Sequence, residues 1–122
     1  MAATEIHIFD RSSHRQELLA GTVVFRAGDA GDVMYAVVEG EVDVSIGDRV
    51  VETIGPGHVF GEMALIDTVP RSATVTARTD CVVVPIPERE FLFLVDEHPT
   101  FALQVMRTLA ERLRHRDSPT TA

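Results

Sequence analysis

Residues 60–76 read FGEMALIDTVPRSATVT, and this stretch contains both a short helical segment and the beginning of a β-strand. Gly61 permits a close approach of the backbone to another group, and the next four residues can form one helical turn. The Val69-Pro70 pair then forces the chain to become extended, because the residue before a proline avoids the helical conformation. A strand should follow, and Arg71 stands at its beginning.

Arg71 falls on the apolar face of this predicted strand. Side chains alternate between the two faces of a strand, so Arg71 shares a face with the apolar residues Ala73 and Val75. It should therefore project into the interior, at the mouth of the fold. An arginine cannot shed its charge, so a partly buried arginine needs an anionic partner. The spacing alone leaves two kinds of partner open: an internal carboxylate, from Glu62 or Asp67, or a bound ligand.

The turn before the strand favours a ligand. The first amides of a single helical turn have no partners within it and can bind an anion. A guanidinium and an amide-rich turn that converge on one point suit a phosphate with two free oxygens. Glu62 would repel such a phosphate, which makes sense if the ligand also carries a hydroxyl donor, such as a ribose 2′-hydroxyl.

The rest of the chain predicts short strands followed by helices. From Thr22 onward, runs rich in β-branched residues alternate with turn signals, and Gly47-Asp48 is a typical hairpin connection. Six or more short strands at regular spacing indicate a sandwich or a closed barrel. The runs are TVVFR, VMYAVVEG, EVDVSI, RVVETI, SATVTAR and CVVVPI.

The two ends of the chain read differently from this β region. Residues 1–20 are weakly patterned, and a short helix capped by Ser12 or Ser13 is the one element we expect there. The barrel is expected over residues 21–87, helices over 88–116 and a flexible tail over 117–122. A first helix should end near His98-Pro99, and Thr100 should cap a second. The second helix carries two apolar stripes, one for the barrel and one for a ligand, a second subunit or further burial.

Composition narrows the class of protein. A chain of 122 residues forms one domain. Its net charge is −8, from 19 acidic residues against 11 arginines, so we expect no basic surface that could bind the phosphate backbone of a nucleic acid. No apolar run is long enough to cross a bilayer, and the first residues do not resemble a signal peptide, so we expect a cytoplasmic protein. The single cysteine, Cys81, lies in an apolar run and is expected to be a buried, inert thiol.

An enzymatic alternative is a cupin-like metal site, because cupins are also small barrels. Metal chemistry needs two or three converging histidines and a carboxylate. His58 and Glu62 are four residues apart, but the other histidines lie near the ends of the chain. Cys81 has no assignable histidine partner for nucleophilic catalysis either. We therefore expect no enzyme, no metal and no cofactor.

Beyond these arguments, FGEMALIDTVPRSATV resembles the phosphate-binding cassette of cyclic nucleotide-binding domains, which typically reads F-G-E-x-A/G-L…x-R-x-A-x-V. The resemblance extends upstream through LLAGTVVFRAGDAGDVMYAVVEGEVDV and IGPGHVFGE, and downstream to the helix HPTFALQVMRTLAERLR. It covers roughly 100 residues of the chain. The resemblance implies a mainly β fold, a jelly-roll barrel with C-terminal helices.

The resemblance also implies roles for the residues of the cassette. Arg71 would pair with the cyclic phosphate, Glu62 would accept the ribose 2′-hydroxyl, and nearby amides would help to hold the ligand. In this family a threonine directly after the arginine favours guanine, and here that position is Ser72, so we expect cAMP rather than cGMP. The predicted ligand-binding residues are Phe60, Gly61, Glu62, Met63, Ala64, Arg71, Ser72 and Ala73.

These observations predict a non-catalytic sensor that signals through its C-terminal helices to a partner protein or a fused domain. A homodimer formed by the last helix is one such arrangement, and Leu109 or Arg112 on that helix could cap the base. The alternative is a degenerate cyclic nucleotide-binding fold that binds only another protein. Such a domain usually loses the arginine or the glutamate, and both are present here.

Overall fold

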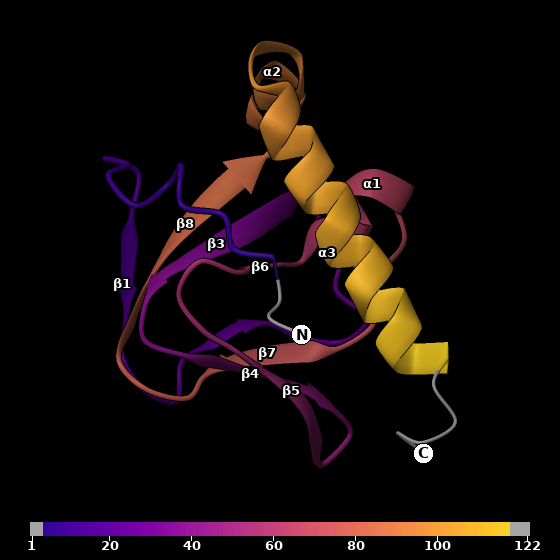
Figure 1. Cartoon of the computed structure of the whole chain (residues 1–122). Helices are drawn as coiled ribbons and strands as arrows, with labels where there is room; N and C mark the ends of the chain where they lie inside the picture. The colour runs from indigo at the N-terminus through magenta and orange to yellow at the C-terminus, as the bar shows by residue number, and fades with distance from the viewer. Residues whose placement is uncertain (1–3, 118–122) are drawn as a thin grey trace.

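The computed structural model describes the backbone of residues 4–117 and the side chains of residues 4–114, and it shows two antiparallel sheets beside three helices (Figure 1). One sheet has the strand order β1-β8-β3-β6 and the other β2-β7-β4-β5. Within residues 4–117 no helix is both long enough and apolar enough to cross a membrane. The strands are β1 (Gln16–Leu18), β2 (Val23–Phe25), β3 (Val33–Glu39), β4 (Val42–Ile46), β5 (Arg49–Ile54), β6 (Val59–Phe60), β7 (Thr74–Ala77) and β8 (Cys81–Pro87).

The central strands β3 and β8 are buried on both faces, which explains their almost continuous apolar sequences. Met34 and Ala36 of β3 face the helices, whereas Val37 faces the opposite sheet. In β8 the division is the same: Ile86 lies on the helix side and Val83 on the inner side. Two apolar clusters result, one inside the barrel and one between the barrel and its helical cover.

The β4–β5 hairpin forms at the predicted turn. Gly47 has a φ of 60°, a left-handed conformation that glycine adopts without steric cost. Val42 is fully buried, but burial decreases along β4 until Ile46 is exposed. Val44 still packs on the inner cluster, so the buried part of this strand ends before Ile46, where the tip of the hairpin extends beyond the barrel (Figure 1).

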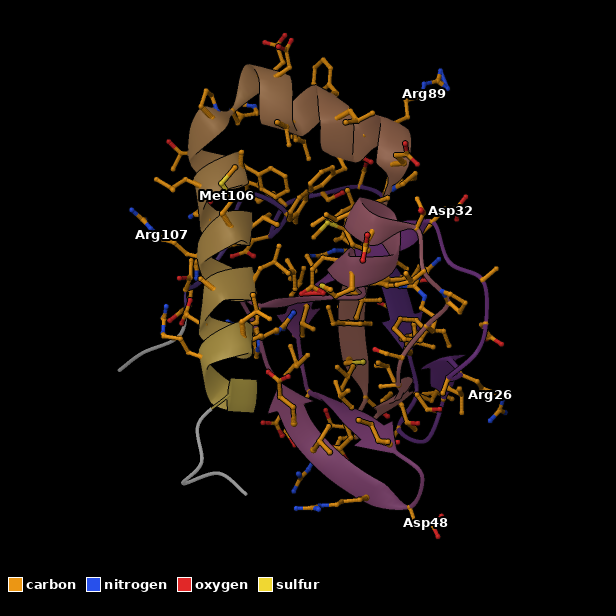
Figure 2. All side chains as sticks on the ribbon, turned by 90° about the vertical axis from the view of Figure 1, so that its right-hand side faces the viewer. Arg26, Asp32, Asp48, Arg89, Met106 and Arg107 are labelled. Carbon is orange, nitrogen blue, oxygen red and sulfur yellow. The ribbon has the colours of Figure 1, made fainter. Side chains whose placement is uncertain are left out.

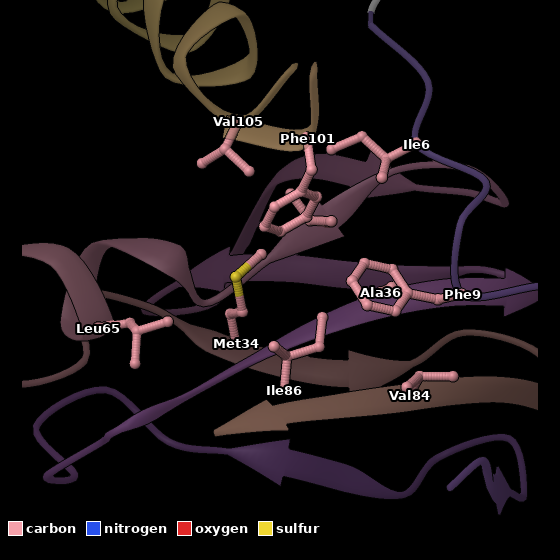
Figure 3. Close-up of a cluster of buried hydrophobic side chains, with 10 residues drawn as sticks. Ile6, Phe9, Met34, Ala36, Leu65, Val84, Ile86, Phe101 and Val105 are labelled. Atoms are coloured by element: carbon pink, nitrogen blue, oxygen red, sulfur yellow. The ribbon is translucent and has the colours of Figure 1, made fainter. Parts of the chain in front are cut away.

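Three helices follow the chain out of the strands: α1 (Glu62–Asp67), α2 (Glu88–Glu97) and α3 (Pro99–Asp117). Phe101 and Val105 of α3 are buried against Met34 and Ile86 (Figure 3). The other predicted stripe of α3 is exposed at Leu103, Met106 and Leu113. One stripe therefore packs on the barrel, and within the described residues the other faces away from it.

Two predictions about helix starts were wrong. Thr100 does not cap the last helix, which begins one residue earlier at Pro99, where the missing amide hydrogen costs nothing. No helix forms within residues 4–20 either: the chain makes a turn after His7, and β1 starts at Gln16 inside the expected N-terminal segment. Apart from Asp117, the predicted tail lies outside the described residues.

The N-terminal segment is fixed by burial instead of by helix formation. Ile6 and Phe9 are almost completely buried beside α3, and the rings of Phe9 and Phe101 meet edge to face at 5.7 Å. The Ile6 amide donates to the Gly57 carbonyl, which attaches the segment to the loop before β6. Ile6 and Phe9 are the two apolar residues that anchor this segment, and β1 pairs with β8. The segment has no apolar stripe at helical spacing, so a helix here would have no face to bury.

Candidate functional site

The local sequence folds residues 60–71 into a tight detour between two strands. β6 ends at Phe60, and Gly61 adopts a left-handed conformation (φ 79°) that turns the chain into the six-residue helix α1. The helix ends at Asp67, and Thr68, which follows it, also has a positive φ of 50°. Residues 68–71 form neither helix nor strand. This detour brings Arg71 back beside Gly61.

Arg71 lies three residues before β7, so the strand is shorter than predicted. The predicted alternation of faces nevertheless holds, because Arg71, Ala73 and Val75 are buried whereas Ser72 is exposed. The Arg71 amide donates to the Asp29 carbonyl at 2.8 Å, and its own carbonyl accepts from Gly28 at 2.7 Å. These two backbone hydrogen bonds fix the start of the side chain.

The guanidinium of Arg71 is buried, with 7% of the residue exposed. Nη1 donates to the Gly61 carbonyl at 2.8 Å and Nη2 to the Val33 carbonyl at 2.6 Å. The central carbon lies 4.0 Å from the centroid of the Phe25 ring, a cation–π distance. Nε has no hydrogen-bond partner. Burial lowers the pKa of Arg71, although the group stays charged at neutral pH.

The internal salt bridge that the sequence left open does not form. Within the described residues no carboxylate is ion-paired with Arg71, and Asp67 is exposed. Asp29 and Asp32 are close enough to favour the charged form but make no ion pair with it. A buried cation held only by carbonyls and an aromatic ring can still accept an anion.

Two glycines make room for this guanidinium. A Cβ built on Gly31 would lie 2.2 Å from Arg71 Nε, and one on Gly61 would lie 2.8 Å from Nη1. Both distances are below ordinary contact, so any larger residue would displace the arginine. The guanidinium is therefore enclosed by the two glycines and the ring of Phe25, an arrangement we call the arginine cage.

Glu62, the other charged residue of the cassette, is buried with 3% of the residue exposed. Its Oε1 is ion-paired with Nη1 of Arg112, a residue of α3, and accepts no hydrogen bond. Arg112 also donates to the Val59 carbonyl, and its Nε lies 3.8 Å from Oε2 of Glu52. From its position in the sequence, Arg112 is a residue that could cap the base. In the structure its guanidinium contacts Glu62, so capping the base would need a different arrangement of this side chain.

The remaining predicted residues divide into buried and exposed ones. Phe60 is buried and stacks on Tyr35 with ring centroids 5.1 Å apart. Ala64 and Ala73 are also buried, whereas the side chains of Met63 and Ser72 are exposed. Gly61 and Arg71 are thus in direct contact, and Phe60 lies 6.0 Å from the Phe25 ring that underlies the guanidinium.

The histidines do not gather around Glu62. His58 Nδ1 lies 3.1 Å from the carbonyl of Thr4, and His7 lies between Glu5 and Asp10 on the surface. Among the side chains of residues 4–114, no group of three or more histidines, cysteines, aspartates and glutamates could hold a metal ion. The pKa of His7 is raised by its hydrogen bonds to Glu5 and Asp10.

Sequence reasoning missed Phe25, Gly31 and the pairing of Arg112 with Glu62. Gly31 needs no positive φ, so only three-dimensional proximity explains why it must be small. The sequence places Phe25 in a predicted strand, and nothing in its sequence context indicates a cation–π contact. Arg112 follows Glu62 by 50 positions, a separation at which sequence spacing carries no information about contact.

Comparison with known proteins identifies the family. The family model described as "Cyclic nucleotide-binding domain" matches residues 15–98, which is more than half of the chain. The chain therefore belongs to the cyclic nucleotide-binding domain family, and its sheets and C-terminal helices confirm the predicted fold class.

Three similar proteins illustrate the range of the family. A cyclic nucleotide-gated potassium channel from Rhizobium etli is 43% identical over 76% of this chain and 26% of its own length. A cyclic AMP receptor protein from Thermus thermophilus is 34% identical over 80% of this chain and 47% of its own. A solved structure from work on a cyclic-GMP-dependent signalling pathway in bacterial phytopathogenesis is 28% identical, with a TM-score of 0.77, and covers 93% of this chain and 95% of that one. The chain thus spans less than half the length of these two sequence relatives.

Proposed function

We propose that this chain is a non-catalytic sensor module that binds a cyclic nucleotide, with cAMP preferred, and signals through α3. The observation that carries the proposal is the arginine cage: a buried guanidinium with an unpartnered Nε and no carboxylate partner among the described residues. A buried cation without an anion is costly, and a singly charged phosphate diester would supply the missing charge.

Arg71 retains the donors that a phosphate needs. A guanidinium has five N–H groups, and the two hydrogen bonds to the Gly61 and Val33 carbonyls occupy two of them. The remaining donors can form the two-pronged pairing that distinguishes arginine from lysine. The amides of Met63 and Ala64, in the first turn of α1, would complete the phosphate contacts.

Glu62 would bind the ribose. An ionised carboxylate accepts hydrogen bonds only, so it selects a ligand with a hydroxyl donor. The resemblance of the cassette to that of the family assigns this role to the ribose 2′-hydroxyl. Ser72 stands where a threonine would favour guanine, and its side chain is exposed. The absence of that threonine is the reason for proposing cAMP rather than cGMP.

The signal would pass to a second subunit through the exposed apolar stripe of α3. Leu103, Met106, Ala110 and Leu113 follow one another at steps of three, four and three, which is the spacing of a coiled-coil seam. Leu103, Met106 and Leu113 are all exposed. A second copy of α3 carries the same spacing and fits it, so we propose a homodimer through this face.

Titration calorimetry with cAMP, cGMP and 5′-AMP tests the proposed function. We expect a dissociation constant of about 1 μM or below for cAMP, which corresponds to roughly −8 kcal/mol. cGMP should bind more weakly, and 5′-AMP more weakly still, because its phosphate is not a diester. Arg71→Ala should lose most of the affinity, since the phosphate would lose its only cationic partner in the proposed site.

Arg26→Ala is the matched control, because this arginine is exposed and projects away from the molecule (Figure 2). It should bind cAMP as the parent does. An absence of heat with all three nucleotides would overturn the proposal and favour the degenerate fold that binds only protein. Equal affinity in the parent and in Arg71→Ala would overturn the assignment of the phosphate to the arginine cage.

A further inference from the structure

The loop between β2 and β3 places two carboxylates beside the arginine cage. Asp29 and Asp32 both belong to this loop, and both are exposed. The Arg71 amide donates to the Asp29 carbonyl at 2.8 Å. Asp32 stands between Gly31, which lies directly against the guanidinium, and Val33, whose carbonyl accepts from Nη2 at 2.6 Å. These contacts fix the backbone of both aspartates next to Arg71.

The two carboxylates act on Arg71 without neutralising it. Within the described residues neither is ion-paired with the guanidinium, which donates to backbone carbonyls instead. Burial lowers the pKa of the guanidinium, and Tyr35, Asp32 and Asp29 oppose this shift. The negative charge of the loop is therefore felt at the place where the anionic group of a ligand would lie.

The arginine cage supplies one positive charge to a ligand. Arg71 is the only arginine among the described residues that is buried. Arg26, in the same loop as the two aspartates, is exposed and projects away from the molecule (Figure 2). Arg112 is paired with Glu62, so that pair adds no net charge. One negative charge of a phosphate is therefore balanced, whereas a second charge would have no cation and would be repelled by two carboxylates.

We propose that Asp29 and Asp32 form an acidic rim that selects the ligand by its charge: it admits a singly charged phosphodiester and repels nucleotides that carry two or more negative charges. Nucleoside mono-, di- and triphosphates belong to the repelled class. This inference rests on the proposed function and adds a specificity determinant to the same site. The energy of an ion in a given electrostatic potential is proportional to its charge, so the rim should weaken a dianion about twice as strongly, in free energy, as a monoanion.

The test uses two ligands with the same base and sugar but different charge. At pH 8, 5′-AMP carries close to two negative charges, because the second pKa of a phosphomonoester is about 6, whereas adenosine 5′-methyl phosphate is a diester with one. For Asp32→Asn at low salt, we expect the affinities for the methyl diester and for cAMP to rise by about twofold to threefold. The affinity for 5′-AMP should rise by about the square of that factor, roughly fourfold to tenfold. Calorimetric titration of the two acyclic ligands, in competition with cAMP, measures these changes.

Salt provides a second measurement on the parent protein. The screening length falls from about 10 Å at 0.1 M salt to about 3 Å at 1 M, so charges on an exposed rim should lose most of their effect. The ratio of the affinities for the methyl diester and for 5′-AMP should therefore decrease with salt in the parent. In Asp32→Asn the ratio should start lower and should change less.

Asp48→Asn is the matched control: it removes the same charge at the exposed tip of the β4–β5 hairpin, far from the rim (Figure 2). All three ligands should bind this variant as they bind the parent. Asp32→Glu retains the charge and should retain most of the discrimination. A glutamate variant that behaves like Asp32→Asn would mean that the shape of the aspartate matters and its charge does not, which would overturn the inference.

The remaining outcomes separate this inference from the proposed function. If Asp32→Asn binds cAMP more weakly than the parent, Asp32 serves to hold Arg71 in place and the acidic rim is wrong. Equal gains for 5′-AMP and for the methyl diester would also overturn it, because selection by charge requires unequal ones. Both results leave the proposed function intact as long as the parent binds cAMP. If the parent binds none of the three ligands, the proposed function falls and this inference with it.

Discussion

At the scale of single residues, the central feature is the set of contacts that hold the buried guanidinium of Arg71. Its charge is spread over two carbonyls and the face of Phe25, and Nε is left without a partner. Such contacts keep a cation in place at moderate cost, whereas a carboxylate would have neutralised it. The cage therefore keeps the arginine ready for an anion.

Gly31→Ala tests the arginine cage without substituting Arg71 itself. The new Cβ would lie 2.2 Å from Arg71 Nε, and Gly31 has no positive φ, so the substitution should move the guanidinium without straining the backbone. We expect the affinity for cAMP to fall by roughly tenfold or more. Stability should fall by about 1–3 kcal/mol, because the displaced guanidinium leaves the Gly61 and Val33 carbonyls without their donor. Calorimetry and urea denaturation measure the two effects.

Gly55→Ala is the control for this prediction, because Gly55 has neither a positive φ nor any atom within 4 Å of a built Cβ. It should bind cAMP as the parent does. If Gly31→Ala also binds normally, the guanidinium does not need its position in the cage, and our description of the site at this scale is wrong.

The sequence predicted the placement of several of these residues. The alternation of faces placed Arg71 in the interior, and the structure agrees even though β7 begins only at Thr74. The choice between an internal carboxylate and a ligand was not readable, because it depends on where Glu62 points. Glu62 points to Arg112, a contact that only the packing of α3 determines.

At the scale of elements, α3 is held to the barrel by its buried stripe. Phe101 is 1% exposed and contacts both Phe9 and Phe91 through edge-on rings. Truncation of a buried phenylalanine removes its burial and leaves a cavity, so Phe101→Ala should destabilise the protein by about 3–5 kcal/mol. Urea denaturation measures this loss.

Leu92→Ala, on the neighbouring helix α2, is the control for it. Leu92 is 57% exposed, and its truncation should cost less than about 1 kcal/mol. Similar losses at the two positions would mean that α3 does not dock through the stripe that contains Phe101.

Hydrogen bonds to the Glu111 carboxylate attach the N-terminal segment to α3. Their strength should depend on pH, because the carboxylate can take up a proton. Glu111 accepts hydrogen bonds from the amide and hydroxyl of Thr4, and the side-chain hydrogen bond is the main cause that lowers the pKa of Glu111. A lowered pKa in the folded state means that the contribution to stability is present above the ordinary pKa of 4.5 and is lost as the pH falls below it.

Glu111→Gln should therefore be less stable than the parent at pH 7 by at most about 1 kcal/mol, since the site is only partly buried. The difference should decrease as the pH falls below the ordinary pKa of 4.5 and through the lowered pKa of the folded state. Denaturation curves at several pH values measure the difference. A constant difference across this range would show that ionisation of Glu111 does not contribute.

The error at this scale was the N-terminal helix. Ser12 and Ser13 are good cap residues, but a cap cannot form a helix without an amphipathic stretch after it. Burial of Ile6 and Phe9 and the pairing of β1 with β8 decided the conformation instead. Phe9 and Phe101, whose rings are in contact, lie 92 positions apart (101 − 9), and local sequence patterns do not report such contacts.

At the scale of the whole molecule, the exposed stripe of α3 that contains Leu103, Met106 and Leu113 predicts that the protein associates with a second copy of itself. Met106→Glu places a charge in the middle of that stripe and should convert a dimer into a monomer, because a buried unpaired charge is costly. Light scattering after size-exclusion chromatography measures the mass. Leu19→Glu, at an exposed leucine far from α3 in the sequence, should leave the mass of the parent unchanged.

A parent that is monomeric both with and without cAMP would contradict the homodimer and leave another protein or a fused domain as the receiver of the signal. The sequence predicted two apolar stripes on this helix, and the structure buries one and exposes the other. The sequence could not decide which stripe faces the barrel, since the two differ mainly in how Phe101 and Val105 fit Met34 and Ile86.

The central claim is that the arginine cage receives the phosphate of a cyclic nucleotide, and a crystal structure of the chain grown with cAMP tests it most directly. The account predicts phosphate oxygens within hydrogen-bonding distance of the Arg71 guanidinium, with the ribose 2′-hydroxyl on Glu62. A nucleotide bound elsewhere on the chain, with Arg71 still donating only to the carbonyls of Gly61 and Val33, would contradict it.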